Sequence, residues 1–215
     1  MMDARVKGPF EPELAQAIVD DALTLAALHE REPTSELIAA LRQADFPMNL
    51  GLLPMDAQQQ DCWQQMRGAI QALPDPISSA QLDDLAAEYA AIYLTGAYQA
   101  SPYESVWTDD EHLMCQASMF TLRKKYADAG LMVANWRSRP DDHFIFQLLF
   151  VAHLAQHAGS TQDWQAIADF LDQHLLAWYP KFVTLIAQRS QNQFYVMLNL
   201  VTAAWAQSLR TAIAL

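Results

Sequence analysis

The chain is short of cysteine and glycine. Of its 215 residues, two are cysteines, Cys62 and Cys115, and six are glycines. Two cysteines cannot form the disulfide framework of a small secreted domain, and this pair lacks the spacing of a zinc site. Each cysteine is therefore expected to be a small buried apolar residue. So few glycines favour helices with short connections over a β-rich fold.

Basic residues are also scarce. The chain has 13 lysines and arginines against 25 aspartates and glutamates, which gives a formal net charge of −12 and a pI of about 4.7. Such a protein repels a phosphate backbone, which argues against nucleic acid as a partner. It attracts a basic peptide, and its electrostatic field raises the rate of their encounter.

Long apolar runs are missing as well. No segment approaches the roughly 20 apolar residues that a membrane-spanning helix needs. Residues 1–10 lack the apolar core of a signal peptide. We therefore expect a cytoplasmic protein without stable membrane insertion. Its hydrophobic fraction of 52% is enough for a packed interior.

What the sequence does contain is helical periodicity, with no sustained alternation of apolar and polar residues. Pro12 and Thr34 are typical of helix starts, and residues 78–81 and 108–111 each have the capping-box pattern that opens a helix. Gly130 is suited to end the helix that would follow residues 108–111. We predict an all-α, single-domain bundle of about nine or ten helices over residues 1–215.

The connection at residues 131–140 is the candidate hinge of this bundle. It is an interhelix segment that carries Trp136 and two arginines before Pro140. The chain is one domain or two small lobes that share a core, and any division into lobes is expected at this connection.

Two further segments combine a proline with carboxylates and aromatic residues. The first, the corner segment, is Gly96–Trp107 and reads Gly-Ala-Tyr-Gln-Ala-Ser-Pro-Tyr-Glu-Ser-Val-Trp. Pro102 fixes its own φ and drives Ser101 toward an extended conformation, so an ordered connection is expected. The second, the Asp-His turn, is Pro140–Phe144 and reads Pro-Asp-Asp-His-Phe. Taken alone, these could be a loop that plugs the core and carboxylates that cap a helix.

Together these segments resemble the motifs of the TorD/DmsD family of cytoplasmic chaperones for molybdenum-containing oxidoreductases. The likeness begins in the helix before the corner segment and continues through residues 174–182 and 194–195, so that it covers the chain from about residue 82 to the end. The chain departs from the family pattern at four positions, which are Ser101, Arg139, Ile145 and Gln147. Gln147 stands where a glutamate is usual.

The resemblance implies a TorD-like fold and a chaperone that is not an enzyme. Such a chaperone binds the twin-arginine leader or the apo form of a molybdopterin-dependent oxidoreductase and assists cofactor insertion before export. It holds no cofactor itself, and it is a monomer or a homodimer that swaps helices across residues 131–140. The residues that match the family's leader-binding region are Tyr89, Tyr93, Tyr103, Glu104, Ser105, Trp107, Asp142, His143 and Phe144.

In this interpretation, Glu104 and Asp142 attract the arginines of the leader, because carboxylates pair well with guanidinium groups. The aromatic residues line a groove for its apolar segment, although helical spacing alone would bury several of them in the core. His143 would be a surface residue with a raised proton affinity, and with Asp142 it would form a polar lip.

A different class of function starts from His153 and His157, which lie on one face of a helix at a spacing of four residues. With nearby carboxylates they could serve a small metal-binding protein or enzyme. A structural site needs about four ligands, however, and His143 lies about 15 Å away along a helix axis. No phosphate-binding glycine loop accompanies them.

Overall fold

The computed structural model describes residues 12–213, and regular structure in this range is helical apart from one isolated bridge. This confirms the predicted all-α bundle of nine or ten helices. The expectation about a signal peptide concerns residues 1–10, which lie outside the described residues. The helices are α1 (Pro12–Glu30), α2 (Ser35–Gln43), α3 (Ala57–Ala72), α4 (Ser79–Tyr93), α5 (Ser105–Thr108), α6 (Ala117–Asp128), α7 (Phe144–His157), α8 (Thr161–Phe170), the π turn η1 (Leu171–Leu175), α9 (Leu176–Arg189) and α10 (Gln193–Ala212).

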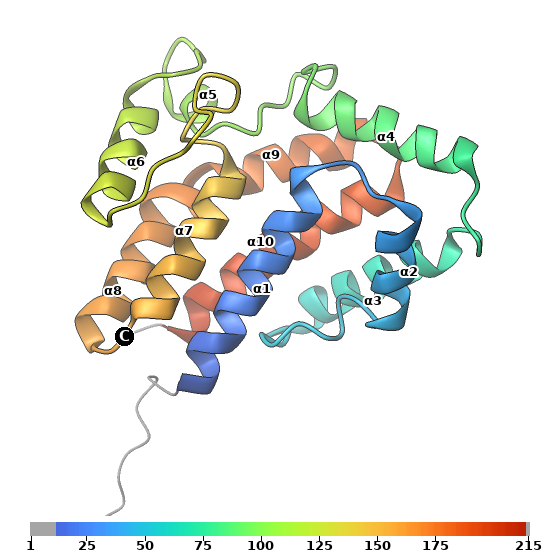
Figure 1. Cartoon of the computed structure of the whole chain (residues 1–215), viewed down its shortest axis with the longest axis horizontal. Helices are drawn as coiled ribbons and strands as arrows, with labels where there is room; N and C mark the ends of the chain where they lie inside the picture. Colours follow the sequence, from blue (N-terminus) through green and yellow to red (C-terminus); the bar gives the residue numbers. More distant parts are fainter. Residues whose placement is uncertain (1–11, 214–215) are drawn as a thin grey trace, which may run out of the picture.

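Helix α10 forms the centre of the bundle. It packs against α3 and α9, while α1 and α7 lie side by side along most of their length (Figure 1). Most of α10 is buried, and its Trp205 is fully enclosed. Trp63 of α3, Trp164 of α8 and Trp178 of α9 are also fully buried. Large side chains from several helices therefore fill one continuous core.

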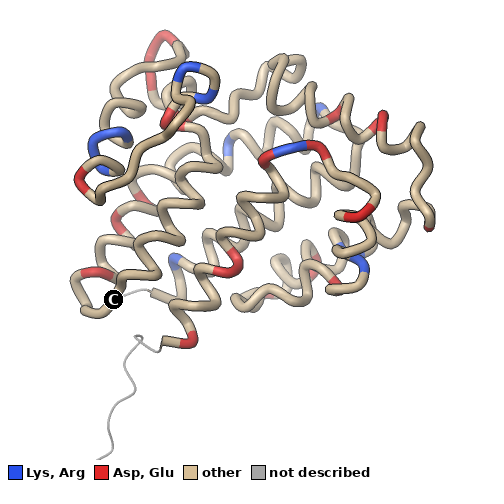
Figure 2. The backbone as a smooth tube through the Cα atoms, viewed as in Figure 1, with Lys and Arg blue, Asp and Glu red and all other residues tan. Residues whose placement is uncertain are grey.

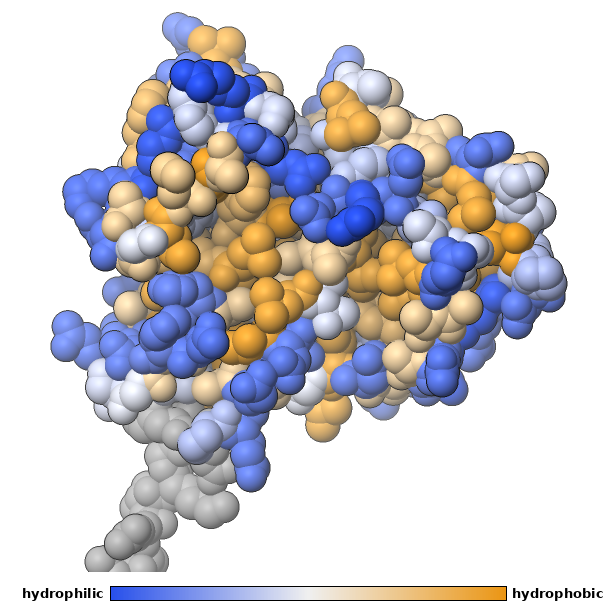
Figure 3. Space-filling model, in the orientation of Figure 1, coloured by the Kyte–Doolittle hydropathy of each residue, from blue (hydrophilic) through white to orange (hydrophobic). Residues whose placement is uncertain are grey.

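The apolar side of this bundle is not wholly covered. Figure 3 shows apolar side chains gathered over the seam between α1 and α7. Leu23 of α1 is 46% exposed and Leu149 of α7 is 39% exposed, and Leu149 lines a pocket with Tyr126 of α6. No helix in residues 12–213 is long and apolar enough to span a membrane.

A buried aspartate fixes the loop between α2 and α3. Asp21 of α1 accepts hydrogen bonds from the backbone N–H groups of Gly51 (2.8 Å) and Leu52 (2.9 Å) and from Trp205 Nε1 (3.0 Å). The loop comes so close to α1 that a Cβ at Gly51 would lie 2.6 Å from the Cβ of Ala17. Only glycine fits this contact without displacing α1.

Most of the predicted helix ends are confirmed. Pro12 begins α1, the Thr34 side chain caps α2, and the capping box at residues 78–81 is fully formed at α4. Gly130 follows the end of α6 with a φ of +75°. The prediction for residues 108–111 was wrong, because the Thr108 hydroxyl donates to the Glu104 carbonyl and ends α5 instead.

The two cysteines differ in environment. Cys62 is half-buried and packs against the core, whereas Cys115 is exposed and has a φ of +61°. The expectation of burial was therefore wrong for Cys115, which lies in the exposed connection between α5 and α6. The connection at residues 131–140 joins α6 to α7, and buried apolar residues on both sides of it belong to one cluster. Its role as a hinge stays a prediction.

Candidate recognition site

The corner segment and the Asp-His turn are joined backbone to backbone. Tyr103 and His143 form an isolated antiparallel bridge. Beside it, the Glu104 N–H donates to the Asp142 carbonyl at 3.1 Å. Residues about 40 positions apart in the sequence therefore form a single structural unit.

Asp142 lies inside this unit rather than on its surface. Its side chain is fully buried, and Oδ2 accepts the backbone N–H of Ser105 at 2.8 Å. Asp142 thus caps α5, whose own N-cap residue, Glu104, makes no side-chain cap. Burial raises the pKa of Asp142, and the hydrogen bonds from Ser105 oppose this shift. The expectation that Asp142 caps its own helix was wrong.

The N-cap of α7 is His143. Its Nδ1 accepts the backbone N–H of Ile145 at 3.2 Å, which requires an unprotonated nitrogen. Burial lowers the pKa of His143 well below its ordinary value, and the charge of Arg139 lowers it further. The expected surface histidine with a raised proton affinity is therefore corrected to a buried, neutral one. Its ring lies edge-on to Tyr103, with 5.0 Å between ring centroids.

Asp141, the other carboxylate of the turn, pairs with α6. It accepts a hydrogen bond from Arg123 Nη2 at 2.7 Å, and its side chain is only 4% exposed. The same guanidinium group lies 4.4 Å from the ring centroid of Trp136. Asp141 therefore ties the Asp-His turn to α6 and to the connection at residues 131–140.

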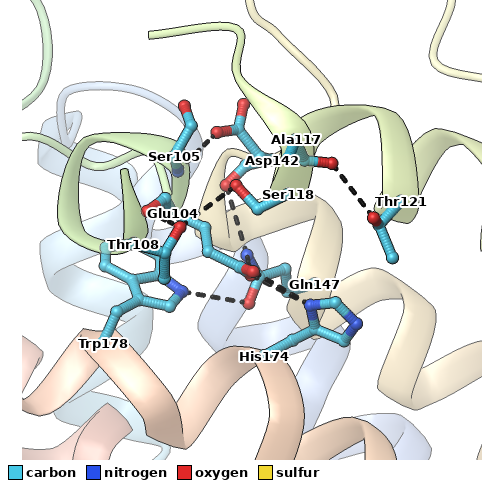
Figure 4. Close-up of polar contacts among 10 residues, drawn as sticks. All are labelled: Glu104, Ser105, Thr108, Ala117, Ser118, Thr121, Asp142, Gln147, His174 and Trp178. Carbon is cyan, nitrogen blue, oxygen red and sulfur yellow. Dashed lines mark hydrogen bonds and ion pairs between the residues drawn. The ribbon is translucent and has the colours of Figure 1, made fainter. Parts of the chain in front are cut away.

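Glu104 is the centre of a second buried cluster, drawn in Figure 4. Its Oε1 lies 3.0 Å from His174 Nδ1, and its Oε2 accepts a hydrogen bond from Gln147 Nε2 at 2.9 Å. Trp178 Nε1 donates to Gln147 Oε1 at 3.4 Å. All four side chains are buried. Glu104 is thus turned toward the core of the folded chain.

His174 and Gln147 were not among the predicted site residues. The sequence did draw attention to both residues. His174 is the first residue of the segment 174–182 that resembles the family, and Gln147 stands where the family usually has a glutamate. Sequence alone could not place either residue against Glu104, from which they are 70 and 43 positions away.

The predicted aromatic residues divide into an inner and an outer group. Tyr89, Tyr93 and Phe144 are buried in the core. The Tyr93 hydroxyl lies 2.7 Å from His29 Nδ1 and accepts Asn199 Nδ2 at 3.0 Å. Desolvation lowers the pKa of His29 to about 3, so this network is neutral.

Tyr103 and Trp107 form the outer group and are only half-buried. Tyr103, but not Trp107, lines a pocket of about 380 Å³ with a mainly apolar lining. Leu94 and Met114 at this pocket are 62% and 44% exposed. The lining residues are Ile92, Tyr93, Leu94, Thr95, Gly96, Gln99, Ala100, Ser101, Pro102, Tyr103, Val106 and Met114.

An acidic loop follows the corner segment. Asp109, Asp110 and Glu111 lie between Val106 and Met114, two residues that line the pocket. In Figure 2 this loop is the acidic stretch at the top, above α6. An apolar pocket thus lies close to carboxylates that face solvent, an arrangement that suits a ligand with both apolar and cationic groups.

The histidine pair of the alternative hypothesis does not form a ligand set. The His153 and His157 rings lie 4.3 Å apart, and His157 Nδ1 lies 2.7 Å from the His153 carbonyl oxygen. Within residues 12–213, no group of three or more His, Cys, Asp or Glu side chains is arranged to hold a metal ion.

Comparison with known proteins gives a consistent result. A family model described as "Nitrate reductase delta subunit" matches residues 56–184. Proteins named "Chaperone protein TorD" are similar to the chain. The one from Vibrio cholerae is 30% identical over 174 residues, which cover 76% of this chain and 77% of that protein.

Two further relatives with this name come from Shewanella. The protein of Shewanella piezotolerans is 31% identical over 139 residues, and that of Shewanella pealeana is 29% identical over 133 residues. These alignments cover 61% and 58% of this chain and span 63% and 58% of the relatives' own length. The relatives are named as chaperones, in agreement with the expectation that the chain is not an enzyme. On the extent of these matches and the two joined motifs, the chain belongs to the TorD/DmsD family.

Proposed function

We propose that the chain is a cytoplasmic chaperone for one molybdopterin-dependent oxidoreductase. It binds the leader or the apo form of the catalytic subunit and delays export until the cofactor is inserted. Membership of the TorD/DmsD family is the observation that carries this proposal. The apolar pocket beside an acidic loop supports it, because a twin-arginine leader combines cations with an apolar segment.

The predicted site residues take two roles in this proposal. Tyr103, which lines the pocket, contacts the apolar segment of the leader there, and the half-buried Trp107 extends this contact from α5. Asp110 and Glu111, which are exposed, attract its arginines. The buried members of the predicted set hold the corner segment in shape from inside, and these are Tyr89, Tyr93, Glu104, Ser105, Asp142, His143 and Phe144.

Titration calorimetry with the client's leader peptide tests the electrostatic part. Raising the salt concentration from 0.05 to about 0.5 M should weaken binding, because the Debye length falls to a few ångströms. The double variant Asp110→Asn, Glu111→Gln should bind more weakly at low salt and should depend less on salt. The matched control is Asp83→Asn, Asp84→Asn, which removes two exposed carboxylates from α4.

Two results would count against this placement of the leader. One is an affinity that does not depend on salt, and the other is equal weakening by the two double variants. Binding of the apo catalytic subunit without any binding of its leader would indicate that the chaperone recognises a different segment of its client.

A further inference from the structure

The contact between Glu104 and His174 joins the corner segment to a distant part of the chain. Glu104 precedes α5, and His174 lies in the π turn between α8 and α9. Their side chains are 3% and 6% exposed. A buried carboxylate is strongly destabilising unless it is paired and hydrogen-bonded. The conformation of Glu104 therefore depends on what His174 and Gln147 offer it.

The π turn presents His174 to Glu104. Such a turn inserts an extra residue into a helix, and it is frequent at functional sites. The turn is held on its other side by Asp172, whose two carboxylate oxygens each lie 2.9 Å from Arg210 Nε of α10. His174 is thus supported by the central helix of the bundle.

His174 makes little use of its second nitrogen. Nε2 is buried and has no hydrogen-bond partner among the described residues. A buried polar atom without a partner is destabilising, so a residue chosen only to fill this space would be apolar. The hydrogen bond of Nδ1 to Glu104 is the polar contact that distinguishes histidine from leucine here.

A pair of tryptophans reports on the same contact. Trp107 of α5 stacks on Trp178 of α9, with 6.4 Å between ring centroids and 27° between ring planes. Trp178 is hydrogen-bonded to Gln147, which also holds Glu104. A displacement of the corner segment would therefore change the geometry of the two indole rings.

We propose that His174 is a positioning residue for the corner segment. Through Nδ1 it fixes the Glu104 carboxylate, and thereby it sets the surface that Tyr103 and Trp107 present to a peptide. This rests on the proposed function only in taking that surface as the peptide site. His174 itself does not contact the peptide.

Three substitutions of His174 separate positioning from packing. His174→Asn places an amide N–H close to the position of Nδ1, whereas His174→Gln moves the amide N–H toward the position of Nε2. His174→Leu keeps the bulk and removes the donor. The stacked Trp107–Trp178 pair should give an exciton signal in circular dichroism, and Trp107→Phe provides the spectrum without it.

The asparagine variant should keep the exciton signal and bind the leader peptide within about threefold of wild type. The leucine and glutamine variants should lose the signal and at least tenfold in affinity, which is about 1.4 kcal/mol. If leucine does not fold, the comparison of asparagine with glutamine decides.

The proposal is overturned if the leucine variant keeps both the signal and the affinity, or if asparagine behaves no better than glutamine and leucine. Loss of the signal with unchanged affinity would support the positioning of the corner segment by His174. It would at the same time refute the placement of the peptide on that surface.

Discussion

Replacing Asp142 by alanine should destabilise the protein by an amount that follows from its contacts. The carboxylate accepts the Ser105 N–H at 2.8 Å in a site without solvent exposure. Alanine leaves that N–H buried and unpaired, which costs about 1–3 kcal/mol. For a chain of this length each kcal/mol lowers Tm by about 2–4 °C. A loss of about 2 kcal/mol should therefore lower Tm by about 4–8 °C.

Asparagine at position 142 should behave differently. Its amide oxygen can still accept the Ser105 N–H, although the bond no longer involves a charge. The weaker bond is partly offset because a buried charge, whose pKa is already raised by desolvation, has been removed. We expect Asp142→Asn to change the free energy of unfolding by less than about 1 kcal/mol. Its affinity for the leader peptide should stay within about threefold of wild type.

The two variants can be compared with wild type by calorimetry. Scanning calorimetry gives Tm, and titration calorimetry on the same preparations gives the affinity for the leader peptide. The critical result is a variant Asp142→Asn with unchanged Tm and a tenfold loss of leader affinity. That outcome would show that the carboxylate itself contacts the peptide, and that the corner segment opens to expose it. The assignment of Asp142 as an internal cap of α5 would then be insufficient.

Asp21→Ala should lower the free energy of unfolding by at least about 2 kcal/mol in urea titrations, because it leaves three donors, two of them buried, without their acceptor; a loss below about 1 kcal/mol would contradict the contacts. Stability should also depend on pH through His29, whose folded-state pKa of about 3 lies below the 6.5 of the unfolded chain. As pH falls below about 6 the unfolded chain binds the proton first, so this histidine removes about 1.4 kcal/mol of stability per pH unit down to about pH 4. Carboxyl groups with raised pKa values, such as those of Asp21 and Asp142, oppose this slope near the lower limit. The difference in slope between wild type and His29→Gln isolates the histidine, and equal slopes would refute its neutral state.

Local signals determined how well the helices could be predicted. The capping box at residues 78–81 depends on side chains three residues apart, so the sequence contains the whole motif. The same pattern at residues 108–111 did not start a helix. There, Thr108 bonds back to Glu104 and Asp109 accepts the N–H groups of the next turn. Whether the pattern at residues 108–111 starts a new helix depends on α5, which ends at Thr108. This helix is only four residues long, and Asp142 caps it from the Asp-His turn.

The burial of the predicted carboxylates could not be predicted from the sequence. The sequence identified Glu104 and Asp142 as carboxylates beside prolines, and a carboxylate is normally exposed. Their burial becomes intelligible only with the partners that the fold supplies, which are the Ser105 N–H for Asp142 and His174 with Gln147 for Glu104. These pairs span 37 to 70 positions, and no periodicity in the sequence encodes them.

This burial changes how the motifs relate to recognition. The internal hydrogen bonds of Asp142 and Glu104 restrict the shape of the corner segment, because breaking them would leave buried polar groups unpaired. In the proposed function, the residues left to contact a client are exposed ones that the motifs support, such as Leu94 and Met114 at the pocket. We infer that the motif residues preserve a common scaffold. The choice of client should depend on the exposed residues around it, and exchanging these between two relatives should exchange their leader preference while Glu104 and Asp142 stay unchanged.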